Sequence, residues 1–217
     1  MNMVLKDTFK HKGMRQQLVE VVRNKGITDE NVLNALGKVP RHLFMDSGFL
    51  DHAYQDKAFP IAADQTISQP YTVAFQTELL QVKKGDKILE IGTGSGYQAA
   101  ILCELGAKVY SIERQLELFK SVSKFLPKLG YRAKKLIFGD GYKGLEEEAP
   151  FDGIIVTAGA PYVPKPLLGQ LKIGGRLVIP VGDIIQVMTL FIRKGEKDFE
   201  KHEFGEFRFV PLLGDKT

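Results

Sequence analysis

The residues best suited to hold a ligand lie at positions 90–97, which read EIGTGSGY and stand between a predicted strand and a predicted helix. Glycines let the backbone approach a ligand closely, and the start of the following helix offers it unpaired N–H groups. Glu90 places a carboxylate where a ligand ammonium would find an anionic partner and a pyrophosphate would be repelled. A dinucleotide-binding loop has its third glycine one position later, where this sequence has Tyr97. The segment therefore favours a ligand with an ammonium group over a dinucleotide.

Two more acids follow the next two predicted strands. Glu113 stands at the end of the second strand, where a carboxylate can accept both hydroxyls of a ribose. Asp140, in the sequence FGDG, ends the third strand and can accept from an adenine amino group. Taken singly, Asp140 fits an ordinary turn and Glu113 a surface pair with Arg114. Because the carboxyl ends of successive parallel strands open on one crevice, the three acids are expected to converge, and an ammonium, a ribose and an adenine together describe S-adenosylmethionine.

These acids need an α/β framework, and the chain from residue 83 to 217 has its pattern. Short β-rich runs alternate with amphipathic stretches, which is typical of a parallel sheet with helices on its faces. The predicted strands are residues 87–91, 108–112, 135–138, 153–156, 176–181, 186–193 and 204–211, with helices starting near Tyr97 and Gln115. The last two runs are joined by a charged turn at residues 194–201, which is too short for a crossover helix and predicts an antiparallel pair.

The first 82 residues read differently, as helices and irregular turns. Apolar residues repeat at helical spacing over residues 14–22 and again over 29–38, where Thr28 is the expected cap and Val39-Pro40 ends the helix. The predicted fold is a single domain over residues 1–217. It is a doubly wound, mostly parallel Rossmann-like sheet, with a C-terminal antiparallel pair and an N-terminal helical extension that covers the active site.

Composition sets the broad class of the protein. The chain has 217 residues, 44% of them hydrophobic, which is enough for one substantial core. A net charge of +4 does not call for nucleic acid as a partner. One cysteine, no signal-like start and no long apolar run favour a cytoplasmic protein. We expect a monomer with neither a nucleic-acid nor a membrane partner.

Several segments resemble a known family over nearly the whole chain. The sequence resembles class I S-adenosylmethionine-dependent methyltransferases and, more closely, the protein-L-isoaspartate O-methyltransferase family. The segments that carry the resemblance are VPR at 39–41, QTISQPY at 65–71, LEIGTGSGYQ at 89–98, GDG at 139–141, FDGIIVTA at 151–158, LKIGGRL at 171–177 and RFVPL at 208–212. The glycine loop fits most of the superfamily, whereas the segment around Thr66, Ile67 and Ser68 is specific to this family.

The resemblance implies an activity and a set of site residues. It implies methyl transfer from S-adenosylmethionine to the α-carboxylate of L-isoaspartyl residues in damaged proteins and peptides, which initiates their repair. Ser68 is implied as the catalytic or substrate-orienting residue, and no metal is expected. The predicted cofactor-binding residues are Gln65, Thr66, Ile67, Glu90, Gly92, Thr93, Gly94, Ser95, Gly96, Glu113, Arg114, Asp140 and Gly141.

The chemistry makes modest demands on the protein. An α-carboxyl has a reference pKa of about 3.3 to 3.7, so the acceptor is already ionised at neutral pH and needs no general base. The Ser68 hydroxyl can hold one carboxylate oxygen in line with the methyl group. Because Pro70 marks a helix start, the local sequence favours Ser68 as a helix cap, whereas the resemblance favours a functional role, and the two roles are compatible. The four histidines, His11, His42, His52 and His202, lack metal-ligand spacing and are expected to be surface or packing residues.

Other functions remain open on sequence alone. They are methyl transfer to another carboxylate, to a small molecule or to nucleic acid, and a binding module that keeps the cofactor pocket without catalysis. Against a nucleic-acid enzyme, Thr157-Ala158 follows the fourth strand where amino-directed DNA enzymes often carry an Asn/Asp-Pro-Pro-aromatic motif. An NAD-dependent oxidoreductase is disfavoured by Tyr97 and Glu90.

Overall fold

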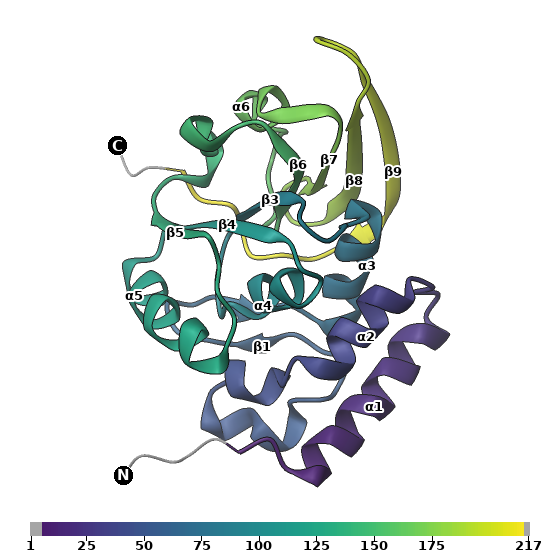
Figure 1. The fold of residues 1–217 in the computed structure, drawn as a ribbon, viewed down its shortest axis with the longest axis vertical. Helices are drawn as coiled ribbons and strands as arrows, with labels where there is room; N and C mark the ends of the chain where they lie inside the picture. Colours follow the sequence, from purple (N-terminus) through teal and green to yellow (C-terminus); the bar gives the residue numbers. More distant parts are fainter. Residues whose placement is uncertain (1–5, 215–217) are drawn as a thin grey trace.

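A seven-stranded sheet between two layers of helices organises the molecule (Figure 1). The computed structural model describes residues 6–214. The sheet has the order β5-β4-β3-β6-β7-β8-β9. Its strands are β3 (Lys87–Ile91), β4 (Lys108–Glu113), β5 (Lys135–Phe138), β6 (Phe151–Val156), β7 (Leu171–Val181), β8 (Gln186–Arg193) and β9 (Phe199–Phe207). A separate antiparallel pair, β1 (Phe59–Pro60) and β2 (Thr66–Ile67), lies outside this sheet.

The direction of pairing changes once across the sheet. Strands β5, β4, β3, β6 and β7 pair in parallel, and β8 and β9 are then added antiparallel. The order reverses at β3, whose neighbours β4 and β6 are reached by connections on its two sides. A ligand crevice forms outside the carboxyl ends of the strands at such a reversal. The predicted fold class is confirmed, and the glycine loop follows β3 at this point.

The helices cover the two faces unequally. They are α1 (Phe9–Asn24), α2 (Glu30–Lys38), α3 (Pro70–Leu80), α4 (Tyr97–Glu104), α5 (Leu116–Phe125) and α6 (Lys165–Gly169), with 3-10 turns η1 (Arg41–Phe44), η2 (Ser47–His52), η3 (Leu126–Leu129), η4 (Gly141–Lys143) and η5 (Glu146–Glu148). Side chains from the first five helices share one hydrophobic core, whereas α6 and nearby turns complete a smaller core on the opposite face.

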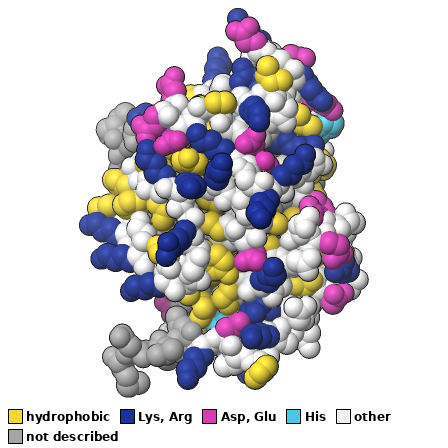
Figure 2. All heavy atoms as spheres, viewed as in Figure 1, with side chains coloured by type: hydrophobic (Ala, Val, Ile, Leu, Met, Phe, Trp, Pro, Cys, Tyr) yellow, Lys and Arg dark blue, Asp and Glu magenta, His cyan; other side chains and the backbone are white. Residues whose placement is uncertain are grey.

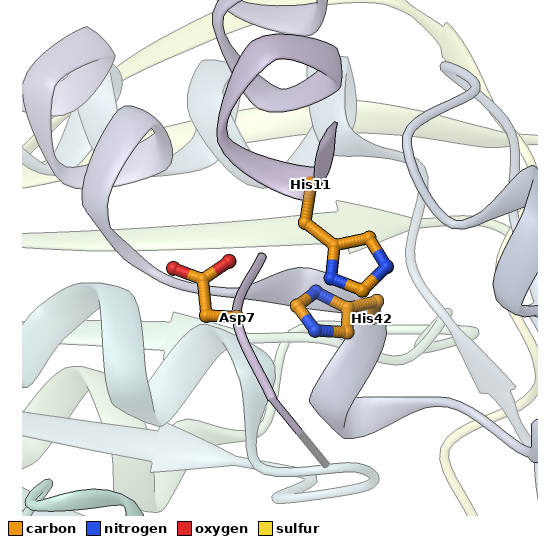
Figure 3. Close-up of side chains that lie close together, drawn as sticks. All are labelled: Asp7, His11 and His42. Carbon is orange, nitrogen blue, oxygen red and sulfur yellow. The ribbon is translucent and has the colours of Figure 1, made fainter. Parts of the chain in front are cut away.

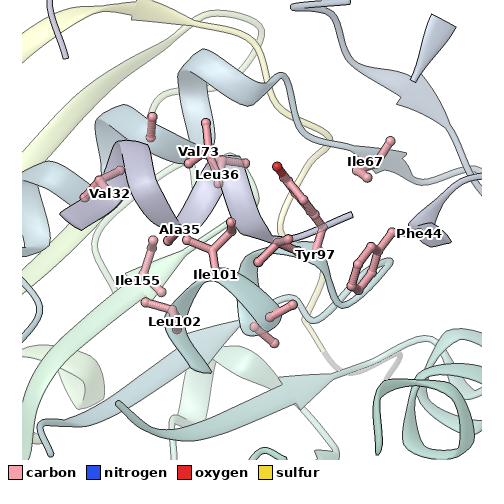
Figure 4. Packing of buried hydrophobic residues seen from close by; sticks show 14 of the residues in the cluster. Val32, Ala35, Leu36, Phe44, Ile67, Val73, Tyr97, Ile101, Leu102 and Ile155 are labelled. Atoms are coloured by element: carbon pink, nitrogen blue, oxygen red, sulfur yellow. The ribbon is translucent and has the colours of Figure 1, made fainter. Parts of the chain in front are cut away.

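Side chains point alternately to the two faces of each strand, so the same strands contribute to both hydrophobic cores. Ile88 packs with the helical layer and Leu89 with the opposite layer, and both are buried. Because successive strand side chains point to opposite faces, Glu90 is directed toward the same face as Ile88. Figure 4 shows the helical side of this core, where Leu36 of α2 and Ile101 of α4 lie close to Val73 of α3. The α4 helix that follows the glycine loop is therefore fixed from several sides.

Several predicted boundaries differ from the structure. Strand β4 ends at Glu113 rather than at residue 112, β6 begins at Phe151 rather than at residue 153, and β7 begins at Leu171 rather than at residue 176. Asp29, not Thr28, caps α2, since its side chain accepts from the N–H groups of Asn31 and Val32. The Thr28 N–H and hydroxyl instead donate to Glu78, which lies on α3. The last strand occupies Phe199–Phe207 rather than residues 204–211, so only residues 194–198 of the predicted charged turn lie outside a strand.

Charged side chains are mixed over the visible surface. Figure 2 shows Lys and Arg side chains spread over this face from top to bottom, with Asp and Glu among them. Within residues 6–214 no helix has both the length and the apolar character required to cross a bilayer. In Figure 1, α1 and α2 lie together at the lower right, and β8 and β9 form the edge of the sheet at the upper right.

Candidate active site

The glycine loop adopts a backbone that its glycines alone permit. Gly92, directly after β3, has φ +94°, and a Cβ there would lie 2.6 Å from the Thr157 hydroxyl oxygen. Gly96 is the N-cap of α4 with φ +84°, and a Cβ there would lie 2.9 Å from a Val122 methyl group. Side chains at either position would meet both backbone strain and a steric clash. The loop is thus held close to its neighbours, with its backbone turned toward the crevice.

Glu113 joins this loop to the end of β4. One carboxylate oxygen accepts from the Gly94 N–H at 2.8 Å, and the other accepts from the Gln115 N–H at 2.7 Å. The side chain is buried to 6% exposure and lines the crevice. Each carboxylate oxygen retains a further lone pair, so the group can still accept from a ligand hydroxyl. The sequence indicated Glu113 as a ligand-binding acid, but its hydrogen bond to the Gly94 N–H of the loop is visible only in the structure.

The crevice is an open cleft of about 790 Å³. Most of the predicted site residues line it: Gln65, Thr66, Ile67, Ser68, Gly92, Thr93, Gly94, Ser95, Glu113, Arg114 and Gly141. Its other side is formed by Thr157 and Ala158 after β6 and by residues 210–213 near the end of the chain. Gly96, Glu90 and Asp140 are not part of this lining. Sequence segments from both the first 82 residues and the sheet thus meet in one cleft.

Glu90 lies behind the cleft rather than in its wall. The side chain is completely buried, and one carboxyl oxygen accepts a hydrogen bond from the Ser111 hydroxyl. The Ser111 hydroxyl also lies 2.6 Å from that of Thr93 in the glycine loop. Burial raises the pKa of Glu90 to about 8, and the negative charge of Glu113 adds to this shift. These surroundings favour the neutral form of the Glu90 carboxyl and connect it to the glycine loop through Ser111, while its contact with a cofactor ammonium stays a prediction.

Asp140 lies beside the cleft and shapes its rim. Its carboxylate accepts from the Tyr142 N–H at 2.9 Å and so caps η4. Its neighbours Gly139 and Gly141 line the cleft directly. The side chain is 8% exposed. Contact between Asp140 and an adenine amino group stays a prediction. The alternative interpretation, that Asp140 belongs to an ordinary turn, is confirmed by its hydrogen bond to the Tyr142 N–H.

Ser68 lies where two clefts meet. It lines the glycine-loop cleft and also a second, larger cleft between the start of α3 and the last strand. The N-cap of α3 is Gln69, and the cap carries no side-chain hydrogen bond, so the capping interpretation of Ser68 is wrong. Among the hydrogen bonds of residues 6–214, none involves the Ser68 hydroxyl. This hydroxyl is available to a ligand.

The second cleft is strongly aromatic, and no motif in the sequence pointed to it. Tyr71 and Phe75 of α3 stack on one another with ring centroids 5.8 Å apart, and Phe75 stacks on Phe207 at 5.4 Å. Phe204 and Phe209 complete the aromatic lining. Lys25, Glu206 and Arg208 add charges of both signs to the same cleft, and Lys25 is paired with Asp56. Aromatic residues at helical spacing in α3 were the available signal, but they are equally typical of a core.

The structure also gathers histidines that the sequence keeps apart. His11 and His42 lie with ring centroids 3.8 Å apart, next to Asp7 (Figure 3). The Asp7 carboxylate accepts from both terminal nitrogens of Arg15, and His42 Nδ1 lies 2.7 Å from the Tyr54 hydroxyl. His11 Nδ1 closes the capping box at the start of α1. His42 Nε2, in contrast, is buried without a hydrogen-bond partner among residues 6–214, and one ligand atom from each of the three side chains lies within 4.8 Å of the others. The packing role of these histidines stays a prediction.

The strand order, the glycine loop and the acid at the end of β4 together define a class I S-adenosylmethionine-dependent methyltransferase. The family model of protein-L-isoaspartate(D-aspartate) O-methyltransferase matches residues 13–217. A protein-L-isoaspartate O-methyltransferase from Christiangramia forsetii is 74% identical over 98% of this chain and 100% of its own length. This chain belongs to the protein-L-isoaspartate(D-aspartate) O-methyltransferase family.

Solved structures agree with this assignment. One protein-L-isoaspartate O-methyltransferase superposes with a TM-score of 0.83 at 30% identity, over 92% of this chain and 66% of that one. A Plasmodium falciparum structure with the same family name has a TM-score of 0.79 at 26% identity, over 93% of this chain and 99% of that one. The Plasmodium falciparum protein was solved in complex with S-adenosyl-L-homocysteine.

Proposed function

We propose that this protein transfers a methyl group from S-adenosylmethionine to the α-carboxylate of L-isoaspartyl residues in damaged proteins and peptides, as the first step of their repair. The observation that carries the proposal is the position of Ser68. Its hydroxyl has no hydrogen-bond partner among the described residues, and the residue lines both the glycine-loop cleft and the aromatic cleft. A methyl donor in the first cleft and a peptide in the second would meet at this residue.

The first cleft has the donor set that the cofactor requires. The glycine loop offers close backbone approach, because a Cβ at Gly92 would fill space next to Thr157. Glu113 can accept from the ribose hydroxyls, and Gly139 and Gly141 add backbone groups to the lining. Gln65, Thr66 and Ile67 line the same cleft. S-adenosylmethionine, when bound, supplies a methyl group already activated on a sulfonium sulfur.

The protein's part in the reaction is then orientation. The acceptor carboxylate is ionised at neutral pH and is itself the nucleophile. Ser68 donates to one carboxylate oxygen and leaves the other free to attack. Holding the reacting atoms in line can account for about 7 to 11 kcal/mol of the barrier. No proton has to be removed, which agrees with a site that offers a hydroxyl rather than a base.

The aromatic cleft is proposed to hold the peptide around the modified residue. Its rings offer apolar surface to flanking side chains, and the charges along it are mixed, because Lys25 is paired with Asp56 and Glu206 lines the cleft together with Arg208. Thr66, which belongs to the first 82 residues, lines both clefts, and its neighbour Ile67 lines the first. We propose that this N-terminal part serves as the active-site cover within a single domain.

We also propose that the protein is cytoplasmic and monomeric. Sedimentation of the purified protein tests the monomeric state.

Two synthetic peptides test the function. They are identical except that one carries L-isoaspartate and the other L-aspartate. Isomerisation adds a methylene to the backbone and leaves the α-carboxylate on a short branch, so a site that clamps the chain on both sides presents only one of the two carboxylates correctly. A displacement of about 1 Å is enough to lower the rate about 100-fold. Radiolabelled methyl incorporation should occur in the isoaspartyl peptide and be released by mild base as an ester hydrolyses. Equal labelling of both peptides, or a base-stable label, would reject the proposal.

A further inference from the structure

Arg41 is a buried cation that no step of the reaction above uses. It ends the VPR segment and begins η1, and its side chain is completely buried. The guanidinium donates to three backbone carbonyls, those of Ala53 at 3.0 Å, Ser68 at 2.9 Å and Lys57 at 3.1 Å. These acceptors are neutral and come from three separate turns of the chain. Arg41 therefore ties the Ser68 segment to the rest of the N-terminal layer.

The charge of Arg41 has no direct counterion. Within residues 6–214, no carboxylate lies within salt-bridge distance of its guanidinium. Asp56 acts on it only at longer range, and the Asp56 carboxylate is itself paired with Lys25 at 2.6 Å. The guanidinium carbon lies 5.0 Å from the ring centroid of Tyr97, the first residue of α4. Burial lowers the pKa of Arg41 to about 10, so the side chain is still charged at neutral pH.

A buried cation without a counterion is unfavourable unless its interaction with another group offsets the cost of removing it from water. Here the guanidinium donates to the carbonyl of Ser68, and Ser68 lines both clefts. A positive charge in low-dielectric surroundings attracts an anion over several ångströms, and it is poorly screened by salt. A direct Arg–carboxylate pair would engage the lone pairs of the attacking oxygen. A cation that is bonded to the Ser68 carbonyl, and not to the acceptor itself, still attracts the acceptor carboxylate and leaves the lone pairs of its attacking oxygen free.

We propose that Arg41 is a positioning residue for the acceptor: it fixes Ser68 through the Ser68 carbonyl, and its charge favours an anionic acceptor over a neutral one. The proposal rests on the proposed function, since the favoured anion is the α-carboxylate of the isoaspartyl residue. It assigns to the VPR segment a role in recognising the charge of the substrate.

The test compares two peptides that differ only in this charge. One carries L-isoaspartate, and the other carries the corresponding α-carboxamide, which cannot be methylated at that group and is measured as a competitive inhibitor. The ratio of the two affinities reports the preference for the anion. It is measured in the wild type, in Arg41→Met and Arg41→Lys, and in Arg15→Met as a matched control. Arg15 is also buried and also donates to a backbone carbonyl, that of Gly37, but it does not contact the Ser68 segment.

We expect Arg41→Met to lower the preference for the carboxylate about tenfold, with affinity for S-adenosyl-L-homocysteine by calorimetry within about twofold of wild type. Arg41→Lys should keep most of the preference, because it keeps the charge, while kcat falls because one ammonium cannot reach three carbonyls. Arg15→Met should lower the thermal midpoint and leave the preference unchanged. If Arg41→Met does not fold, Arg41→Gln replaces it with the same expected result.

Other outcomes overturn the inference. A preference that is unchanged in Arg41→Met, or that falls equally in Arg15→Met, would show that Arg41 is only structural. Equal loss of preference in Arg41→Lys and Arg41→Met would show that charge is not what Arg41 contributes. A wild-type enzyme that does not methylate the isoaspartyl peptide at all would reject the proposed function itself. The two failures are therefore distinguishable in one set of measurements.

Discussion

Ser68 and Glu90 show how surroundings decide what a polar side chain near a cleft can do. The Ser68 hydroxyl has no partner among the described residues, and the residue lines two clefts. Glu90 is enclosed, hydrogen-bonded to Ser111 and absent from the cleft wall. A free exposed donor can contact a ligand, whereas an enclosed carboxyl acts through its neighbours. Replacing the polar group of Ser68 is therefore expected to lower the reaction rate, whereas replacing that of Glu90 is expected to leave cofactor affinity nearly unchanged.

Replacing Ser68 with alanine removes the donor that we propose holds the acceptor carboxylate. We expect kcat for the isoaspartyl peptide to fall roughly 10- to 100-fold, since a hydrogen bond to a charged group is worth about 1.5 to 3 kcal/mol. Affinity for S-adenosyl-L-homocysteine should change little. Steady-state methylation and calorimetry measure the two effects. Ser123→Ala, which removes a hydroxyl from α5 away from both clefts, is the control. Equal rates in wild type and Ser68→Ala would remove Ser68 from the reaction.

Glu90→Gln separates the two interpretations of Glu90. The amide keeps the shape of the side chain and an acceptor for the Ser111 hydroxyl but has no charge. Because the carboxyl is enclosed and its pKa is raised to about 8, we expect affinity for S-adenosylmethionine at pH 7 to stay within about twofold. A direct ion pair with the cofactor ammonium predicts a loss of tenfold or more. Calorimetric titration at pH 7 therefore decides between a loop support and a ligand contact.

At the scale of elements, the site is assembled from the ends of strands and the loop between them. Parallel strands β3, β4 and β6 end at one edge of the sheet, and the chain leaves each of them into the cleft. Glu113 at the end of β4 holds Gly94 in the loop after β3. Cofactor affinity and the position of the glycine loop are consequently linked through one side chain.

This link predicts a double effect for Glu113→Gln. An amide has one acceptor oxygen, so it cannot accept from both the Gly94 and the Gln115 N–H groups as the carboxylate does. We expect weaker binding of S-adenosyl-L-homocysteine, about tenfold or more, together with a lower free energy of unfolding by about 1 to 3 kcal/mol. Calorimetry and urea denaturation measure the two. Glu117→Gln, at an exposed position on α5, is the matched control and should change neither. Unchanged affinity in folded Glu113→Gln would remove Glu113 from the cofactor site.

The sequence predicted the parallel core well, because buried strands there are short apolar runs bounded by turns. It placed the last strand poorly for a physical reason. Strand β9 is an edge strand, FEKHEFGEF, in which five of the nine residues are exposed and four are charged, and charged residues protect an edge from further pairing. A strand of this kind has the composition of a solvated turn. Its partner β8 fixes its position, which no local pattern shows.

The same limit applies to the cap of α2 and to Arg41. Thr28 had the residue type of a cap, but Glu78 binds its N–H and hydroxyl from α3. Arg41 stood in a conspicuous motif, yet its partners are carbonyls of residues 53, 57 and 68. In both cases the partner lies far along the chain. Residue types predicted the ligand class, whereas tertiary contacts decide which groups remain free to bind it.

At the scale of the whole molecule, two buried titratable groups act on stability in opposite directions. Burial and the nearby His11 lower the pKa of His42 to about 4, and burial raises that of Glu90 to about 8. Between about pH 4 and 6.5 the unfolded chain binds a proton at residue 42 that the folded chain does not, so this contribution raises stability as pH rises. Between about pH 4.5 and 8 the folded chain keeps a proton at Glu90 that the unfolded chain loses, so this contribution lowers stability as pH rises.

The two contributions separate above about pH 6.5, where only Glu90 is still changing. We expect the free energy of unfolding of the wild type to fall from pH 6.5 to 8, with a slope from Glu90 of at most about 1.4 kcal/mol per pH unit. Glu90→Gln should reduce this slope and be relatively more stable at pH 8 than at pH 6.5. His42→Gln should leave the slope above pH 6.5 unchanged and reduce the opposite slope below it. Urea unfolding of the three proteins at half-unit intervals provides the measurement. A wild-type slope above pH 6.5 that Glu90→Gln fully retains would mean that Glu90 is already ionised in the folded protein, and the loop would then be supported by a charge.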